Sequence, residues 1–186
     1  MAQLCSDATV EMIVRDMQSG DADPSARIEA LLAEYPEDAR LHFLYGSLLV
    51  QAGRLIEGHN ALKRTVELAP DFAIARFQLG LFQLTSGETA NALDTFGRLD
   101  GLPDGHYLRK FVDGLRCLIR DDFQGVIANL REGIALNAEN LPLNKDMGLI
   151  IEQCEPLASG TPREDDAAMS ETSLVLRQFS KRRDLN

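Results

Sequence analysis

Histidine is the residue type most often used to bind transition metals or to transfer protons, and this sequence contains three: His42, His59 and His106. His42 and His59 are close enough in the chain to approach one another across a helical hairpin. A zinc site needs at least three protein ligands, and no third donor accompanies these two. We therefore expect all three histidines at surface positions and predict no metal ligand.

The cysteines and paired acids also fail to form a recognisable reaction centre. Cys5, Cys117 and Cys154 contain no CxxC pair, which argues against a zinc or dithiol site. Asp121–Asp122 and Asp165–Asp166 are adjacent pairs, and neighbouring side chains do not face one another on a helix. The first pair is expected to be solvated or to cap a helix. No phosphate-binding loop, HExxH, GxSxG or dinucleotide motif is present, so we predict no enzyme, no catalytic residue and no cofactor.

Composition narrows the class of protein and its partners. The chain has 186 residues, of which 45% are hydrophobic and 26% charged, as in ordinary globular proteins. A net charge of −10 disfavours binding to nucleic acid, because phosphate repels such a surface. No run approaches the ~20 apolar residues of a membrane span, and no signal peptide is visible. Cys117 and Cys154 lie on apolar helix faces, so we expect buried thiols and a cytoplasmic location.

A repeat of 34 residues organises the segment from 37 to 138. Its recurring columns are Gly46/Gly80/Gly114, Phe43/Phe77/Phe111, Val50/Leu84/Leu118, Leu62/Phe96/Leu130 and Gly53/Gly87. Each copy has apolar residues at three- and four-residue steps with a turn between them, which predicts helix pairs at 39–52/55–68, 73–86/89–99 and 106–120/123–136. Glycine inside a helix costs about 0.5–1 kcal/mol, so its return on a strict period indicates close packing between paired helices.

A 34-residue helical hairpin with a small residue in each first helix resembles the tetratricopeptide repeat (TPR) family, here its small bacterial-type members. The resemblance implies an all-α fold, an α-solenoid of antiparallel helix pairs. Residues 99–105 depart from the family pattern, because loop residues replace the last helical turn of the second copy.

Two helices are expected within residues 1–36, as a degenerate repeat. The first carries an apolar stripe at Val10, Ile13, Val14 and Met17, and Ser6 or Asp7 can cap it. The second is expected to begin with Asp23 as N-cap and Pro24 in its first turn.

Beyond the repeats, residues 139–155 are predicted to form a helix that caps the exposed end of the array. Its core stripe includes Met147 and Ile151, and its outer face is expected to carry Asn144, Lys145, Glu152 and Gln153. Residues 156–186 are expected to be a linker followed by an amphipathic tail with a basic end. A helix starting at a Thr161–Glu164 capping box is one interpretation of that tail, and a frayed end is the other.

By resemblance to the family, the first helix of each repeat lines a concave groove. The groove positions in this chain are Phe43, Ser47, Val50, Ile74, Phe77, Leu81, Leu84, Leu108, Phe111, Leu115 and Leu118. This lining is apolar and lacks the cations of chaperone-clamp members, so it suits an amphipathic helix or an extended apolar peptide. The alternative is that the chain's own terminal helices fill the groove.

Two functions follow from this pattern. The first is a non-catalytic module that binds a protein or peptide segment in the groove. The second is a secretion-type chaperone that keeps an apolar client soluble. Self-docking of the tail and a homodimer are further options for the groove, and neither a nucleic-acid partner nor a membrane span is expected.

Overall fold

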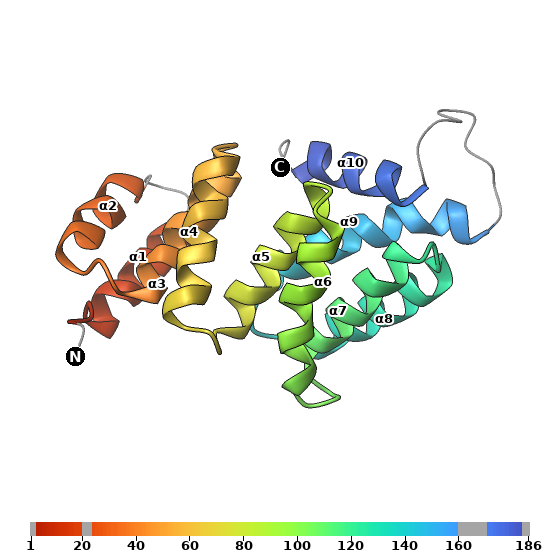
Figure 1. The fold of residues 1–186 in the computed structure, drawn as a ribbon, viewed down its shortest axis with the longest axis horizontal. Helices are drawn as coiled ribbons and strands as arrows, with labels where there is room; N and C mark the ends of the chain where they lie inside the picture. The colour runs from red at the N-terminus through yellow and green to blue at the C-terminus, as the bar shows by residue number, and fades with distance from the viewer. Residues whose placement is uncertain (1–2, 20–23, 160–170, 184–186) are drawn as a thin grey trace. The chain divides into compact units, whose positions relative to one another are not determined.

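The computed structural model describes residues 3–19, 24–159 and 171–183, and within them it contains only helices and their connections, which confirms the all-α prediction (Figure 1). The α-helices are α1 (Asp7–Ser19), α2 (Ser25–Glu34), α3 (Ala39–Gln51), α4 (Leu55–Leu68), α5 (Ala73–Thr85), α6 (Thr89–Gly97), α7 (Tyr107–Ile119), α8 (Phe123–Leu136), α9 (Leu141–Ala158) and α10 (Glu171–Arg183). A 3-10 helix, η1 (Arg98–Gly101), follows α6. The chain forms two compact units, Met1–Leu79 and Gly80–Asn186, whose boundary lies inside α5.

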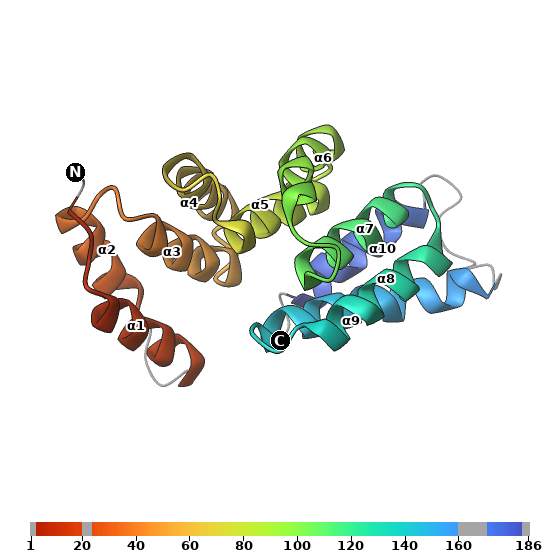
Figure 2. The ribbon, with the colours of Figure 1, turned by 90° about the horizontal axis from the view of Figure 1, so that it is seen from below.

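The first unit is built around the helical hairpin of α3 and α4. Helices α1 and α2 both pack against α3 (Figure 2). Its core joins Ile13 of α1, Ile28 of α2 and Leu41 of α3, none of which is exposed. Ser6 caps α1 by accepting a hydrogen bond from the amide of Thr9. The N-cap of α2 is Pro24 rather than a side-chain cap, and the predicted cap Asp23 lies outside the described residues.

The second unit contains the α7–α8 hairpin, with α9 packed on α8 and α10 packed on α9. Asn140 starts α9 by accepting a hydrogen bond from the amide of Leu143. The helix continues to Ala158, past the predicted end at 155 and through Pro156, which lies in its last turn. Gln153 is 3% exposed, so its predicted place on an outer face is wrong. The reason is that α9 is packed by both α8 and α10 and has less free surface than an end cap would.

The periodic glycines lie where the two helices of each hairpin come closest. The contacts join Gly46 to Leu62, Gly80 to Phe96, and Gly114 to Leu130. A Cβ atom at Gly80 would lie 2.4 Å from Cε1 of Phe96, and one at Gly114 would lie 2.6 Å from Cδ2 of Leu130. Because these distances are far below van der Waals contact, the missing side chain makes room for the partner helix, as the repeat predicted.

The turn inside each hairpin also repeats, with one change of residue. Gly53 and Gly87 adopt positive φ angles of 73° and 82°, the left-handed conformation that glycine allows after a helix end. The same position of the third hairpin is Asp121, with φ at 56°. All three turns therefore have the same backbone handedness, although only two have the residue that favours it.

Two arginines of α7 hold the irregular segment after α6. Arg116 pairs with both carboxylate oxygens of Asp100, at 2.8 and 3.1 Å. Arg109 donates to the carbonyls of Asp100 and Leu102, at 3.0 and 2.9 Å. The segment that departs from the repeat pattern is thus fixed to the following helix by its own contacts.

We expect Gly80→Ala to lower the free energy of unfolding by about 1–3 kcal/mol, the usual cost of overpacking, and Gly80→Leu to lower it at least as much. The added Cβ must displace the ring of Phe96. Urea denaturation followed by circular dichroism measures the effect. Gly97→Ala, at the end of α6, is the control, because no atom lies within 4 Å of its added Cβ. Equal stability of the Gly80 and Gly97 variants would show that Gly80 is not a close-contact point.

Candidate peptide-binding surfaces

The structure divides the eleven predicted groove residues by their exposure. Seven are at most 2% exposed: Phe77, Leu81, Leu84, Leu108, Phe111, Leu115 and Leu118. Four are partly exposed: Phe43, Ser47, Val50 and Ile74. Apart from Ile74, the predicted lining of the second and third repeats is therefore buried in this conformation, and solvent reaches only Ile74 and the first-repeat positions.

Phe111 shows why a position predicted to face a groove is buried. Its ring meets Tyr107 edge-on, with centroids 5.8 Å apart. A Cβ at Gly133 of α8 would lie 2.5 Å from two ring atoms of Phe111, so the ring fills space left by that glycine. Phe111 is thus part of the α7–α8 contact. The sequence signal for this burial is Gly133, which lies inside a predicted helix but in none of the recurring columns of the repeat.

The C-terminal helix α10 contributes three buried side chains to the second unit. Val175, Leu176 and Phe179 are 0%, 8% and 1% exposed, and α10 packs against α9. At its first turn, the hydroxyl of Thr172 lies within hydrogen-bonding distance of the carbonyl of Leu118 and a carboxylate oxygen of Asp121. The predicted capping box at Thr161–Glu164 and the pair Asp165–Asp166 lie outside the described residues.

In the first unit, partly exposed groove positions lie beside α5. The rings of Phe43 and Phe72 are tilted at 49° with centroids 5.0 Å apart. The hydroxyl of Ser47 lies 3.0 Å from the side-chain oxygen of Gln78. Val50 is not part of this surface, because it packs against α4: a Cβ at Gly58 would lie 2.6 Å from Cγ2 of Val50. We call the remaining residues, Phe43, Ser47, Ile74 and Gln78, the Phe43 surface.

The helical repeat seen here is also recognised by comparison with known families. The family profile described as tetratricopeptide repeat matches residues 17–57 and 50–105. The chain belongs to the tetratricopeptide repeat family. No curated protein matches it. The matched residues end before α7, so the third TPR rests on the 34-residue register and on the contact of Gly114 with Leu130.

TPR segments generally mediate protein–protein interaction, and that coarse function applies to this chain. None of the described helices is long and apolar enough to cross a membrane. In the ranges 3–19, 24–159 and 171–183, no three His, Cys, Asp or Glu side chains gather as a metal site.

The residues first considered for chemistry have local structural partners. Nε2 of His42 lies 2.9 Å from the carbonyl oxygen of Pro36. His106 is the N-cap of α7, and its Nδ1 accepts from the amide of Leu108. Asp122 caps α8 by accepting from the amide of Gly125, at 2.9 Å. The expected cap carboxylate is thus Asp122, whereas its neighbour Asp121 reaches α10.

The three cysteines are buried and none forms a disulfide, as expected for Cys117 and Cys154. Burial raises the pKa of the Cys117 thiol, and a hydrogen bond with Asp122 raises it further. A raised pKa lowers the thiolate fraction at neutral pH, so this environment does not favour nucleophilic chemistry at Cys117.

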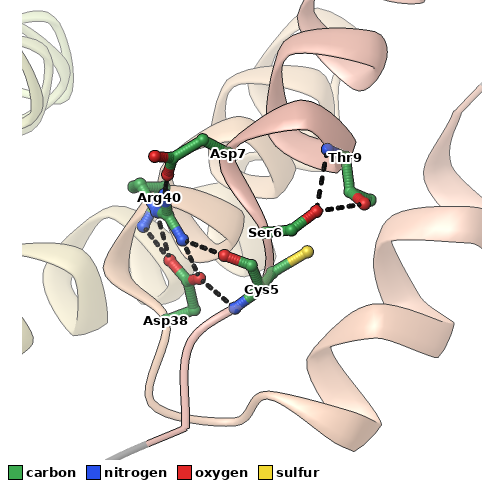
Figure 3. A network of polar contacts seen from close by, with 6 residues as sticks. All are labelled: Cys5, Ser6, Asp7, Thr9, Asp38 and Arg40. Atoms are coloured by element: carbon green, nitrogen blue, oxygen red, sulfur yellow. Dashed lines mark hydrogen bonds and ion pairs between the residues drawn. The ribbon is translucent and has the colours of Figure 1, made fainter.

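A polar network around the buried Asp38 fixes the start of α3, the helix that carries Phe43 and Ser47 (Figure 3). Asp38, the N-cap of α3, has no exposed surface and accepts from the amides of Cys5 and Arg40, both at 3.0 Å. The guanidinium of Arg40 pairs with Asp38 at 2.7 Å and also bonds the carbonyl of Cys5 and the carboxylate of Asp7. The network thereby ties the N-terminal segment to the first TPR.

The network sets the protonation of Asp38. Burial by itself raises the pKa of this carboxyl, but hydrogen bonds from Arg40 and from two backbone amides outweigh that effect and leave the pKa below its ordinary value. In the unfolded chain an aspartate has a pKa of about 3.9. The folded state therefore binds this proton less readily than the unfolded state does, and the stabilisation is present above about pH 4 and is lost as the pH falls through the lowered pKa.

We expect Asp38→Asn to lower the free energy of unfolding at pH 7 by about 1.5–3 kcal/mol, the typical contribution of hydrogen bonds to a charged group. Below about pH 4, the free energy of unfolding of the variant should also decrease less with falling pH than that of the wild type. Urea denaturation between pH 3 and 7 measures both effects. Glu57→Gln removes an exposed carboxylate whose pKa is lowered by Arg54, and this control should change the profile far less. An unchanged pH profile in Asp38→Asn would contradict the assigned role.

Proposed function

We propose that this TPR protein is a non-catalytic interaction module that binds an apolar helical or extended segment of another protein at the Phe43 surface. One observation carries the proposal. Phe43 and Ser47 remain partly exposed, whereas the residues one repeat later, Phe77 and Leu81, are at most 2% exposed.

The chemistry of the Phe43 surface suits such a ligand. The paired rings of Phe43 and Phe72 supply apolar contact, and Ile74 is a further apolar side chain that is partly exposed. The Ser47 hydroxyl and the Gln78 amide add hydrogen-bonding groups beside the aromatic pair. An apolar patch with a few polar groups is the arrangement that binds an amphipathic helix or an extended strand. It presents no cation for a carboxylate terminus.

We place this binding in the cytoplasm. The support is that none of the three cysteines forms a disulfide, which is the usual state of cysteines in a reducing compartment. Under this proposal the chain has neither a catalytic residue nor a cofactor.

A photo-reactive phenylalanine at position 43 or 47 tests the proposal. Introduced separately in the full chain and irradiated in native cell extract, both positions should cross-link the same protein through the same apolar segment, mapped by mass spectrometry. The matched control is position 64, where Arg64 forms an exposed pair with Glu67 on α4. Cross-links at 64 alone, or different adducts at 43 and 47, would contradict binding at the Phe43 surface.

The cross-linked segment also separates the two candidate roles. A segment of an apolar secreted protein would favour the chaperone role, and a segment of a folded enzyme or regulator would favour the scaffold role.

Substitution of Phe77 or Phe111 cannot serve as the test of binding. Removing a fully buried phenylalanine costs about 3–5 kcal/mol, so lost binding in such a variant would report lost folding.

A further inference from the structure

Two side-chain contacts join α3 to residues 72–78, which include the first half of α5. In the first contact, the ring centroids of Phe43 and Phe72 lie 5.0 Å apart. In the second, the hydroxyl of Ser47 lies 3.0 Å from Oε1 of Gln78. Phe43 and Ser47 are four residues apart in α3, and a helix places residues at that spacing on one face. The polar contact therefore lies on the same face of α3 as the aromatic contact.

The Ser47 contact orients the side chain of Gln78. The Ser47 hydroxyl lies between Oε1 of Gln78, at 3.0 Å, and the carbonyl oxygen of Phe43, at 2.9 Å. A carboxamide is planar, as a peptide group is, so a contact at its oxygen also sets the direction of its nitrogen. The position of Nε2 of Gln78 is thus determined by α3.

Solvent reaches this nitrogen. Nε2 carries two N–H donors, and no acceptor for them lies among the residues that the structure describes. Gln78 is partly exposed, and within the described ranges no buried side-chain nitrogen or oxygen lacks a hydrogen-bond partner. Nε2 is therefore not a buried atom. The Phe43 surface presents an oriented donor that no described residue uses.

This donor restricts the ligands that can cover the Phe43 surface. A ligand that removes Nε2 from water without supplying an acceptor leaves a buried N–H unpaired, which is unfavourable. The apolar face of a helix supplies no main-chain acceptor, because carbonyls in a helix interior already accept intrahelical hydrogen bonds. An extended segment has no internal hydrogen bonds, so its carbonyls remain open to a donor beside its apolar side chains.

We propose that Gln78 selects the ligand of the Phe43 surface by donating from Nε2 to a main-chain carbonyl. The ligand is then an extended apolar segment of a partner protein and not an amphipathic helix. This inference rests on the proposed function and specifies the conformation of its ligand. Phe43, Phe72 and Ile74 supply apolar contact, and Ser47 positions the carboxamide. Because side chains alternate in direction along an extended segment, the ligand should carry apolar residues at every second position.

The first experiment uses a displayed library of random 12-residue peptides, selected on full-length wild-type protein and depleted on Phe43→Ala. The selected peptides are synthesised, and their affinities are measured by fluorescence anisotropy on variants whose fold is checked by circular dichroism. Gln78→Met retains the length of the side chain and removes the donors. It should weaken binding about fivefold, the effect of losing one hydrogen bond. Equal affinity for Gln78→Met and wild type would overturn the proposal.

The matched control for this experiment is Gln18→Met. Gln18 is an exposed glutamine of α1, so the same chemical change is made in the same unit but outside the Phe43 surface. This variant should bind the selected peptides like the wild type. Equal weakening by Gln18→Met and Gln78→Met would overturn the assignment of Gln78.

The conformation of the bound peptide is tested with α-aminoisobutyric acid, a residue that favours helix. Placed at the centre of a selected peptide, it should cause a loss of affinity, because the extended conformation becomes harder to adopt. Selected sequences should also show apolar residues with a period of two. A gain in affinity, or apolar residues at three- and four-residue steps, would identify a helical ligand and overturn the proposal.

The contact with a main-chain carbonyl is tested by replacing single peptide bonds of the ligand with esters, which weakens the carbonyl as an acceptor. One such ester should weaken binding to the wild type and have no effect on Gln78→Met. N-methylation of the same bond removes only its N–H, so its effect should be equal on both proteins. Dependence of the N-methyl effect on Gln78 would show that Gln78 accepts a hydrogen bond. Loss of that dependence after alanine replacement of one polar ligand side chain would identify a side-chain acceptor. Either result would overturn the assignment.

Failure of the proposed function has a different result. If no displayed peptide binds the wild type more tightly than Phe43→Ala, the Phe43 surface does not bind peptides, and both proposals are overturned. If the selected peptides depend on Phe43 but not on Gln78, binding at the Phe43 surface stands and selection by Gln78 is overturned.

Discussion

The close approach of paired helices at the periodic glycines is the constraint on which the rest of the structure depends. In each hairpin, a side chain of the second helix lies where a Cβ of the first would be, Leu62, Phe96 or Leu130 in turn. That contact sets how near the two helices lie and therefore which of their other residues fall into the shared interior. The aromatic ring at Gly80 leaves the least room, so the second repeat depends most strongly on having no side chain there.

Equivalent positions of the repeat have different environments because the residues that surround them differ from copy to copy. In the first unit, the N-terminal segment is tied to the start of α3 by Asp38 and Arg40, and Phe43 remains partly exposed. In the second unit, Gly133 admits the ring of Phe111 into the α7–α8 contact. One repeat pattern thus provides a partly exposed aromatic residue in one copy and a core residue in another.

Adjacent carboxylates at the third turn show how one residue can serve local structure and its neighbour a distant segment. Asp122 accepts the amide of Gly125 and starts α8, a role that needs only its own turn. Asp121 adopts a conformation better suited to glycine and contacts Thr172, 51 positions later in the chain. Local structure explains the role of Asp122, whereas the contact of Asp121 joins its turn to α10.

The sequence alone determined the helices and their pairing, because both depend on local periodicity and on glycine spacing that any one repeat displays. The predicted helices 55–68 and 123–136 coincide with α4 and α8, and the family follows from the same register. Burial of Phe77 and Phe111, the extension of α9 and the docking of α10 depended on contacts between residues distant in sequence. A repeat determines which face of a helix is apolar, but only the tertiary structure decides which segment packs against that face. The free energy of packing depends on the residues of both surfaces in contact, and these can lie far apart in the sequence.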